Sequence, residues 1–150
     1  EVQALVTSSS SIGMPRRMSA GFDHNRTSLL VAIMEKRLGL NLQGEDIFIN
    51  IAGGLKISEP AVDMGVAAAI AGSFRNRSVD PHTVMIGEVG LTGEVRSVMQ
   101  LEARLAEAER LGFKKCVVPH SIKEDRLINK SSSLRLVPVK TLSDAFDTVF

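Results

Sequence analysis

The stretch "EDIFINIAGGLKISEPAVDMGVAAAIAG", residues 45–72, decides how this chain folds. Its first part alternates isoleucine with other residues, a period of two that predicts a strand with one buried face. The pair Gly53–Gly54 then permits a turn that β-branched residues do not make. Pro60 suits the first turn of a helix, and the alanines and glycines after it let other elements approach closely. We therefore predict a strand, a turn, and a central helix from Pro60 to about Phe74.

Further strands and helices are expected on both sides of this stretch. One helix has Asp23 or Asn25 as its cap and Gly39 as its stop, and the last helix is capped by Thr141 or Ser143. Alternating strands and helices are typical of an α/β fold with a mixed sheet. The expected strands lie at 1–6, 16–22, 82–98 (two, joined by a turn), 114–119 and 134–139. The expected helices lie at 23–40, 99–112 and 141–150, with a helical turn at 121–126. The apolar face of the helix at 99–112 comprises Leu101, Leu105, Ala108 and Leu111.

The composition is that of an ordinary globular protein. The chain has 150 residues, 44% of them hydrophobic and 23% charged, which fits one domain over 1–150. No apolar run reaches the ~18 residues that span a bilayer, and the N-terminus does not resemble a signal peptide. With a single cysteine, Cys116, expected in a buried strand, we predict a cytoplasmic protein without membrane contact. The chain begins within a predicted strand and without Met, so we expect a fragment of a longer protein.

Several common site motifs are missing from the sequence. The nearest approach to a phosphate-binding loop, "GEVGLTGEV", has Glu94 directly after Gly93, and a carboxylate there would repel phosphate. No G-x-G-x-x-G follows a strand, and no G-x-S-x-G is present. The three histidines have no ligand spacing, so we expect no metal site. With six Phe, no Trp and no Tyr, the chain has few side chains for stacking on nucleic-acid bases.

Basic residues are clustered although the net charge is only +1. Clustered arginines and lysines can bind backbone phosphates without regard to base sequence. Since neighbouring residues on a strand face opposite ways, only one of Arg16 and Arg17 would face a bound phosphate backbone, whereas Arg75 and Arg77 could project together from a loop. Surface ion pairs or subunit contacts remain an equal alternative for the whole set. The candidates are Arg16, Arg17, Arg26, Lys36, Arg37, Arg75 and Arg77.

Four blocks, at 52–74, 86–98, 101–119 and 144–150, together resemble a known family. They are similar to the proteolytic domain of Lon proteases, and more closely to the Lon-like C-terminal domain of the RadA (Sms) family of bacterial recombination ATPases. The similarity covers essentially the whole chain. It implies the fold of the Lon proteolytic domain, which is related to domain 2 of ribosomal protein S5.

The same comparison implies that the catalytic dyad of Lon is lost. The "GPSAG"-like stretch that carries the Lon serine aligns with "EPAVD", where the serine position is Ala61. The lysine position falls on Glu102, within "MQLEAR". Glu59 and Asp63 are expected to complement the dipole of the adjacent helix. Lys56 and Ser58 could form a substitute dyad, but nothing in the sequence orients them.

The resemblance therefore implies a non-proteolytic domain that serves hexamer assembly and DNA binding. It implies that a zinc motif and a RecA-like ATPase precede this domain, so zinc, ATP and Mg belong to those parts and no cofactor to this one. The full-length proteins of the family act on DNA in repair, recombination and branch migration. Two other functions stay open: a Lon-type peptidase with an unrecognised nucleophile, and a protein-interaction platform without DNA contact.

Overall fold

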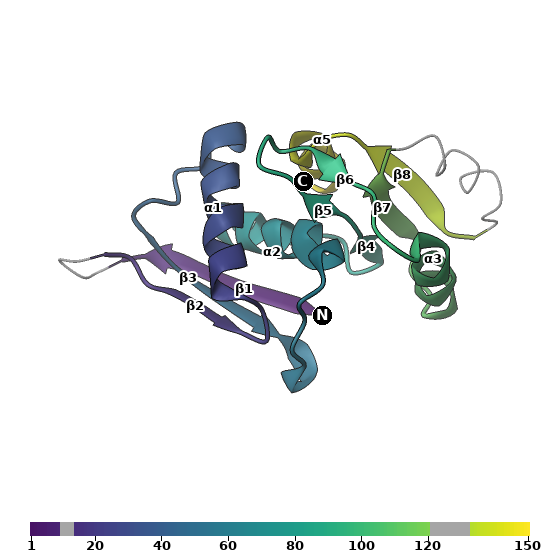
Figure 1. The fold of residues 1–150 in the computed structure, drawn as a ribbon, viewed down its shortest axis with the longest axis horizontal. Coiled ribbons are helices and arrows are strands. Elements are labelled where there is room, and N and C mark those ends of the chain that lie inside the picture. Colours follow the sequence, from purple (N-terminus) through teal and green to yellow (C-terminus); the bar gives the residue numbers. More distant parts are fainter. Residues whose placement is uncertain (10–13, 121–132) are drawn as a thin grey trace.

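The computed structural model describes residues 1–9, 14–120 and 133–150. Helices pack on three small sheets (Figure 1), so the α/β prediction is confirmed. The first sheet is mixed, because its central strand β3 is antiparallel to β1 and parallel to β2. The N-terminal elements are β1 (Val2–Ser8), β2 (Arg17–Ala20), α1 (His24–Leu38) and β3 (Glu45–Ile51).

Both ends of α1 follow the sequence prediction. The side chain of Asp23 accepts a hydrogen bond of 2.7 Å from the backbone N of Arg26, so Asp23 is the N-cap. The helix stops at Gly39, which has a left-handed φ of 65°. Lys36 and Arg37 lie in the last turn, where the helix dipole favours positive charge.

The stretch at 45–72 also folds as predicted, with one difference in its helix. Three isoleucines of β3 are buried, while Phe48 is half-buried on the opposite face. The turn η1 (Ala52–Gly54) contains Gly53 at φ 80°. The predicted helix is divided into a 3₁₀ turn, η2 (Pro60–Val62), and the α-helix α2 (Asp63–Arg75). Figure 1 shows α2 at the centre of the molecule, between the first sheet and the C-terminal elements.

The C-terminal elements form a parallel sheet, a hairpin and two helices. The sheet has the order β4-β7-β8, and β5 pairs with β6 alone. The region 82–98 forms three short strands where two were predicted. The capping box of the last helix identifies Thr141 as its cap. The helical turn predicted at 121–126 lies outside the described residues. The elements are β4 (Thr83–Met85), β5 (Glu88–Val89), β6 (Val95–Arg96), α3 (Leu101–Arg110), β7 (Lys115–Pro119), β8 (Arg135–Val139) and α5 (Leu142–Val149).

The apolar residues form two cores. The larger surrounds α2 and joins α1, β3 and α5, and the smaller lies under α3. Leu101, Leu105 and Ala108 belong to the smaller core, but Leu111 is 60% exposed, so its predicted place on the buried face is wrong. The reason is that α3 ends at Arg110, and Leu111 no longer continues its apolar stripe.

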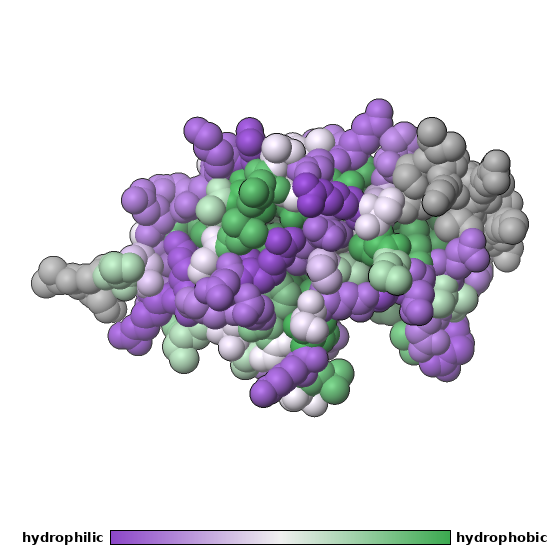
Figure 2. Space-filling view, viewed as in Figure 1, coloured by the Kyte–Doolittle hydropathy of each residue, from purple (hydrophilic) through white to green (hydrophobic). Residues whose placement is uncertain are grey.

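The surface seen in Figure 2 is mostly hydrophilic, with apolar side chains in small separate areas. Within the described ranges, no helix has the length and hydropathy needed to cross a membrane.

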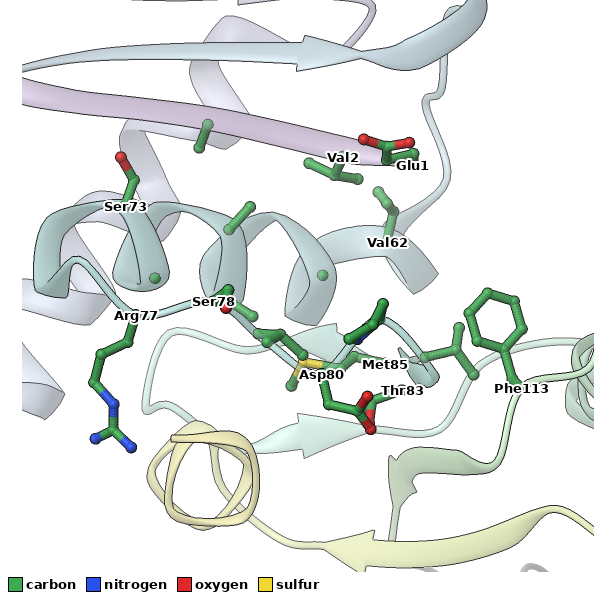
Figure 3. A pocket seen from close by; sticks show the side chains of 18 of the residues that line it. Glu1, Val2, Val62, Ser73, Arg77, Ser78, Asp80, Thr83, Met85 and Phe113 are labelled. Atoms are coloured by element: carbon green, nitrogen blue, oxygen red, sulfur yellow. The ribbon is translucent and has the colours of Figure 1, made fainter.

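A groove of about 1180 Å³ runs along α2 (Figure 3). One wall is the N-terminal half of β1, and the other comprises the segment 76–81 and β4. The floor is formed by small residues of α2, among them Gly65 and Ala69.

Candidate functional site

The residue at the predicted nucleophile position is buried and unreactive. Ala61 is the second residue of η2, is 6% exposed, and belongs to the smaller core with Ile86, Leu101 and Leu105. Its carbonyl accepts a hydrogen bond of 2.9 Å from the backbone N of Gly87. A methyl group enclosed by apolar side chains offers no atom that could attack a carbonyl.

The other dyad position, Glu102, lies on the exposed side of the first turn of α3. Two residues further on, Arg104 forms an ion pair with Glu59 and donates from its Nε to the carbonyl of Met99 at 2.9 Å. The segment before η2 is thus tied to the start of α3. Glu59 was expected only to complement the helix dipole, and the structure gives it this further role.

Lys56 and Ser58 do not form a substitute dyad in the structure. Both side chains are exposed, while Ile57 between them points inward and donates its backbone N–H to Gly21 at 2.8 Å. Among the described contacts, no hydrogen bond joins Lys56 to Ser58. Cys116 is fully buried in β7, and burial raises the pKa of its thiol to about 12. Neither the hydroxyl of Ser58 nor the thiol of Cys116 is prepared for nucleophilic attack.

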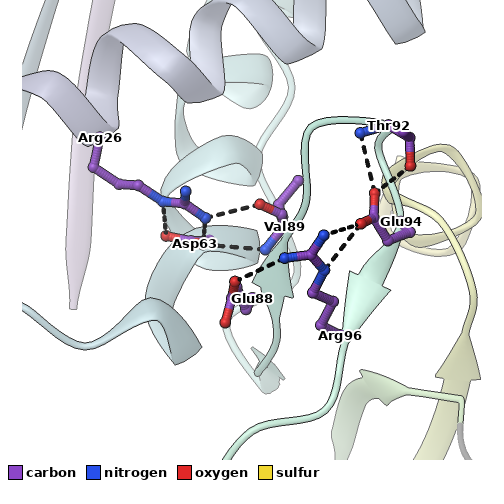
Figure 4. A network of polar contacts seen from close by, with 7 residues as sticks. All are labelled: Arg26, Asp63, Glu88, Val89, Thr92, Glu94 and Arg96. Carbon is purple, nitrogen blue, oxygen red and sulfur yellow. Dashed lines mark hydrogen bonds and ion pairs between the residues drawn. The ribbon is translucent and has the colours of Figure 1, made fainter.

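Asp63 has a larger role than its predicted interaction with the helix dipole. It is fully buried at the start of α2 and pairs with Arg26 of α1 (Figure 4). The Nε of Arg26 lies 3.1 Å from Oδ1 of Asp63, and its Nη2 also donates to the carbonyl of Val89 at 2.8 Å. The backbone N of Val89 donates to Asp63 at 3.1 Å. The hydrogen bond to Asp63 raises the pKa of Arg26. This arrangement fixes α1, α2 and β5 to one another.

A second polar network organises the "GEVGLTGEV" hairpin beside the first (Figure 4). The carboxylate of Glu94 accepts hydrogen bonds from Thr92 and pairs with Arg96, which also contacts Glu88. The hydrogen bonds from Thr92, together with Arg96, lower the pKa of Glu94 to about 2. A Cβ at Gly90 would collide with the carboxylate of Glu94, so a larger residue there would displace that side chain from its contacts with Thr92 and Arg96. The glycines of this motif lie in and beside the hairpin of β5 and β6.

The seven basic candidates separate into two groups. Arg16 is exposed just before β2, and Arg17 is half-buried, which agrees with the opposite directions expected of neighbouring strand residues. Lys36 and Arg37 are exposed at the end of α1, where the stem of Arg37 lies close to Gly93. Within the described residues, no ion pair involves Arg16, Arg17, Lys36 or Arg37. The other three, Arg26, Arg75 and Arg77, have internal partners.

Arg75 and Arg77 lie together as expected, but against α5. The guanidinium of Arg75 lies 5.7 Å from the ring centroid of Phe146 and 5.5 Å from that of Phe150. Arg77 donates a hydrogen bond to the backbone oxygen of Phe150. Sequence reasoning could not find these contacts because they join residues more than 70 positions apart.

Metal ligands do not converge in the part of the chain that the structure describes. In residues 1–9, 14–120 and 133–150, no group of three or more His, Cys, Asp or Glu side chains is placed to hold a metal ion.

The structure shows a mixed α/β domain with a buried alanine, Ala61, at the predicted nucleophile position. The chain belongs to the family described as subunit ChlI of Mg-chelatase, whose model matches residues 10–122. Curated proteins to which it is similar carry the name DNA repair protein RadA, so the resemblance to RadA is confirmed.

Three of these relatives show the extent of the similarity. The chain is 48% identical over 147 residues to the protein of Halalkalibacterium halodurans, covering 98% of this chain and 32% of that protein. It is 53% identical to the Bacillus subtilis protein over 119 residues, which cover 79% of this chain and 26% of that protein. It is 43% identical to a Streptococcus pyogenes serotype M3 protein over 150 residues, which cover 100% of this chain and 32% of that protein. The chain therefore spans about a third of the length of the curated relatives it matches.

Proposed function

We propose that this chain is the non-peptidase domain of a DNA repair protein, which binds DNA through backbone phosphates and assembles into a hexamer. The observation that supports the role in DNA repair is the similarity of the chain to proteins named DNA repair protein RadA. In the longer protein, this domain would act during recombination and branch migration. The replacement of a nucleophile by buried Ala61 supports the absence of peptidase activity.

The basic residues without internal partners are the proposed DNA contacts. Arg16, Lys36 and Arg37 are exposed and free of ion pairs with described residues, so their charges are available to phosphates. Arg17 is a weaker candidate because it is half-buried. Arg26 is the weakest, since Asp63 and Val89 already take the hydrogen bonds of its guanidinium.

Assembly would strengthen such a small site. Three cations per subunit give weak binding alone, but their repetition around a ring raises the affinity for a long strand through avidity. Contacts to phosphates carry little base-sequence information, so binding should be independent of sequence.

The test measures DNA affinity and its salt dependence. Fluorescence anisotropy with a labelled single-stranded oligonucleotide is recorded between about 50 and 200 mM salt, a range over which phosphate contacts weaken strongly. The variant Arg16→Glu/Lys36→Glu/Arg37→Glu should bind more weakly and show a salt slope smaller by about 2. A matched variant, Lys114→Glu/Arg135→Glu/Lys140→Glu, changes three exposed cations elsewhere and should bind like the natural chain.

Equal losses in both triple variants would contradict the proposed contacts, because they would reflect total charge alone. The absence of DNA binding at low salt by an assembled chain would contradict the function itself. Analytical ultracentrifugation tests the assembly, and a chain that stays monomeric at high concentration would contradict the hexamer.

A further inference from the structure

The groove along α2 contains an open strand edge. In the sheet order β1-β3-β2, β1 pairs on one side only. The backbone N of Val6 donates to the hydroxyl of Ser73 on α2, at 2.9 Å. The backbone N–H of Val6 therefore points away from β3. Because the direction of the N–H and C=O groups alternates from residue to residue along an antiparallel strand, those of Val2 and Ala4 point the same way as those of Val6.

The contacts of odd-numbered residues agree with this direction. The carbonyl of Glu1 and the backbone N of Ser9 bond with Ala52 and Gly44, at the two ends of the β1–β3 ladder. Among the described residues, the outward N–H and C=O of Ala4 have no hydrogen-bond partner. Ala4 is one of the residues that line the groove, so the open edge of β1 borders a hollow of about 1180 Å³. Unpaired peptide groups on such an edge are the part of a sheet to which another extended chain can pair.

The floor of the groove leaves room beside this edge. Gly65, Ala69 and Ser73 follow one another at intervals of four along α2, so they lie on one side of the helix. An added Cβ at Gly65 would come no closer than 4.0 Å to any atom outside its own helix. Side chains of an incoming segment could therefore extend toward α2 without a clash.

The charges of the groove favour a particular class of ligand. Figure 3 shows Arg77 at one end of the groove, and Glu1 and Asp80 on opposite walls further along it. Hydrogen bonds from His82 and Thr83 lower the pKa of Asp80. Arg77 already bonds to Phe150. The carboxylate of Asp80 thus offers a local negative charge that suits a basic side chain.

We propose that this groove binds an extended segment of a partner protein, which pairs with the open edge of β1 and places a Lys or Arg beside Asp80. The main-chain hydrogen bonds supply affinity, and the small residues of α2 and the carboxylate of Asp80 supply selectivity. This site is separate from the exposed cations Arg16, Lys36 and Arg37 of the proposed DNA contacts.

The test uses random 12-residue peptides displayed on phage, selected against the immobilised chain. The best enriched sequences are synthesised and their affinities measured by calorimetry. Enriched peptides should contain a Lys or Arg, and their binding should shift the NMR amide signal of Ala4 and protect it from hydrogen exchange.

Three variants change the proposed site by different means. Ala4→Pro removes the outward N–H and leaves the ladder to β3, since proline is tolerated on edge strands, and should weaken binding about tenfold. Ala69→Phe fills the floor of the groove and should abolish binding. Asp80→Asn should weaken binding of the basic peptide about threefold. The matched control Ala32→Phe adds the same ring on the exposed side of α1 and should bind like the natural chain.

Circular dichroism and thermal melting first establish whether each variant is folded. If Ala4→Pro is unfolded, the affinity of Ala69→Phe decides the outcome. Selection of no peptide, or equal affinity of a peptide for the natural chain and Ala69→Phe, would overturn the proposal. The proposal would also be overturned if Ala69→Phe changed the oligomeric state of the chain and the selected peptides did not compete with self-association. In that case a second copy of this chain, and not a partner protein, would fill the groove.

Discussion

Arg26 and Asp63 form an ion pair that connects α1 to α2, with the Asp63 side chain fully buried and that of Arg26 25% exposed. We expect Asp63→Asn to destabilise the chain by about 3 kcal/mol, because the guanidinium loses its charged partner in a largely buried site. Chemical denaturation measures the change. The matched variant Glu107→Gln removes an exposed pair with Arg110 and should change stability by less than about 1 kcal/mol. Similar effects of the two variants would show that the buried pair contributes no more than a surface one.

The Glu94 network makes stability depend on pH. In the folded chain the pKa of Glu94 is about 2, below the value of 4.5 of an unperturbed glutamate. The folded state therefore gains stability from ionised Glu94 above pH 4.5 and loses it as the pH falls toward 2. The denaturation midpoints of the natural chain and Glu94→Gln should differ at pH 7 and converge below pH 4.5. A difference that stays constant down to pH 2 would contradict this assignment.

The same hairpin predicts an effect of adding one methyl group. Gly90→Ala should destabilise the chain by about 1 kcal/mol, because the new Cβ displaces the Glu94 carboxylate from Thr92 and Arg96. Gly44→Ala is the control, since a Cβ there would meet no atom within 4 Å. In a Glu94→Ala background, the cost of Gly90→Ala should fall, because the clashing carboxylate is gone. A cost that is unchanged in this background would place the strain elsewhere.

The proposed absence of peptidase activity has a direct test. The chain should not hydrolyse casein and should form no adduct with a fluorophosphonate, a reagent for activated serines. The physical reason is that Ala61 carries no hydroxyl and that no described residue orients Ser58. Turnover that disappears in Ser58→Ala would refute the proposal and identify the nucleophile.

Local signals in the sequence predicted the elements that depend on neighbouring residues. Alternating isoleucines predicted β3, and the side chains of Asp23 and Thr141 fixed two helix starts, because a cap needs only the next few residues. The short strands at 82–98 were harder to place. The hairpin of β5 and β6 pairs locally, but β4 has three residues and is defined by its pairing with β7, some 30 residues away.

The polar contacts could not be predicted for the same reason. Arg26 and Asp63 are 37 positions apart, and each has an ordinary local role, as a helix residue and as an acidic group at a helix start. Arg75 was expected to project from a loop together with Arg77, and no residue near it in the sequence indicates its contacts with Phe146 and Phe150. Ala61 differs from these cases: only the resemblance to Lon domains marks it as a nucleophile position, and its burial in η2 depends on contacts with distant residues such as Leu101 and Leu105.

The inaccessibility of Cys116 has a practical consequence. Maleimides react with thiolates, and a buried thiol with a pKa of about 12 supplies almost none at neutral pH. A cysteine introduced on the surface, for example at Ser58 or Lys114, would become the sole point of dye attachment in an otherwise natural chain. Single-molecule fluorescence on DNA could then follow this domain without first removing its own cysteine.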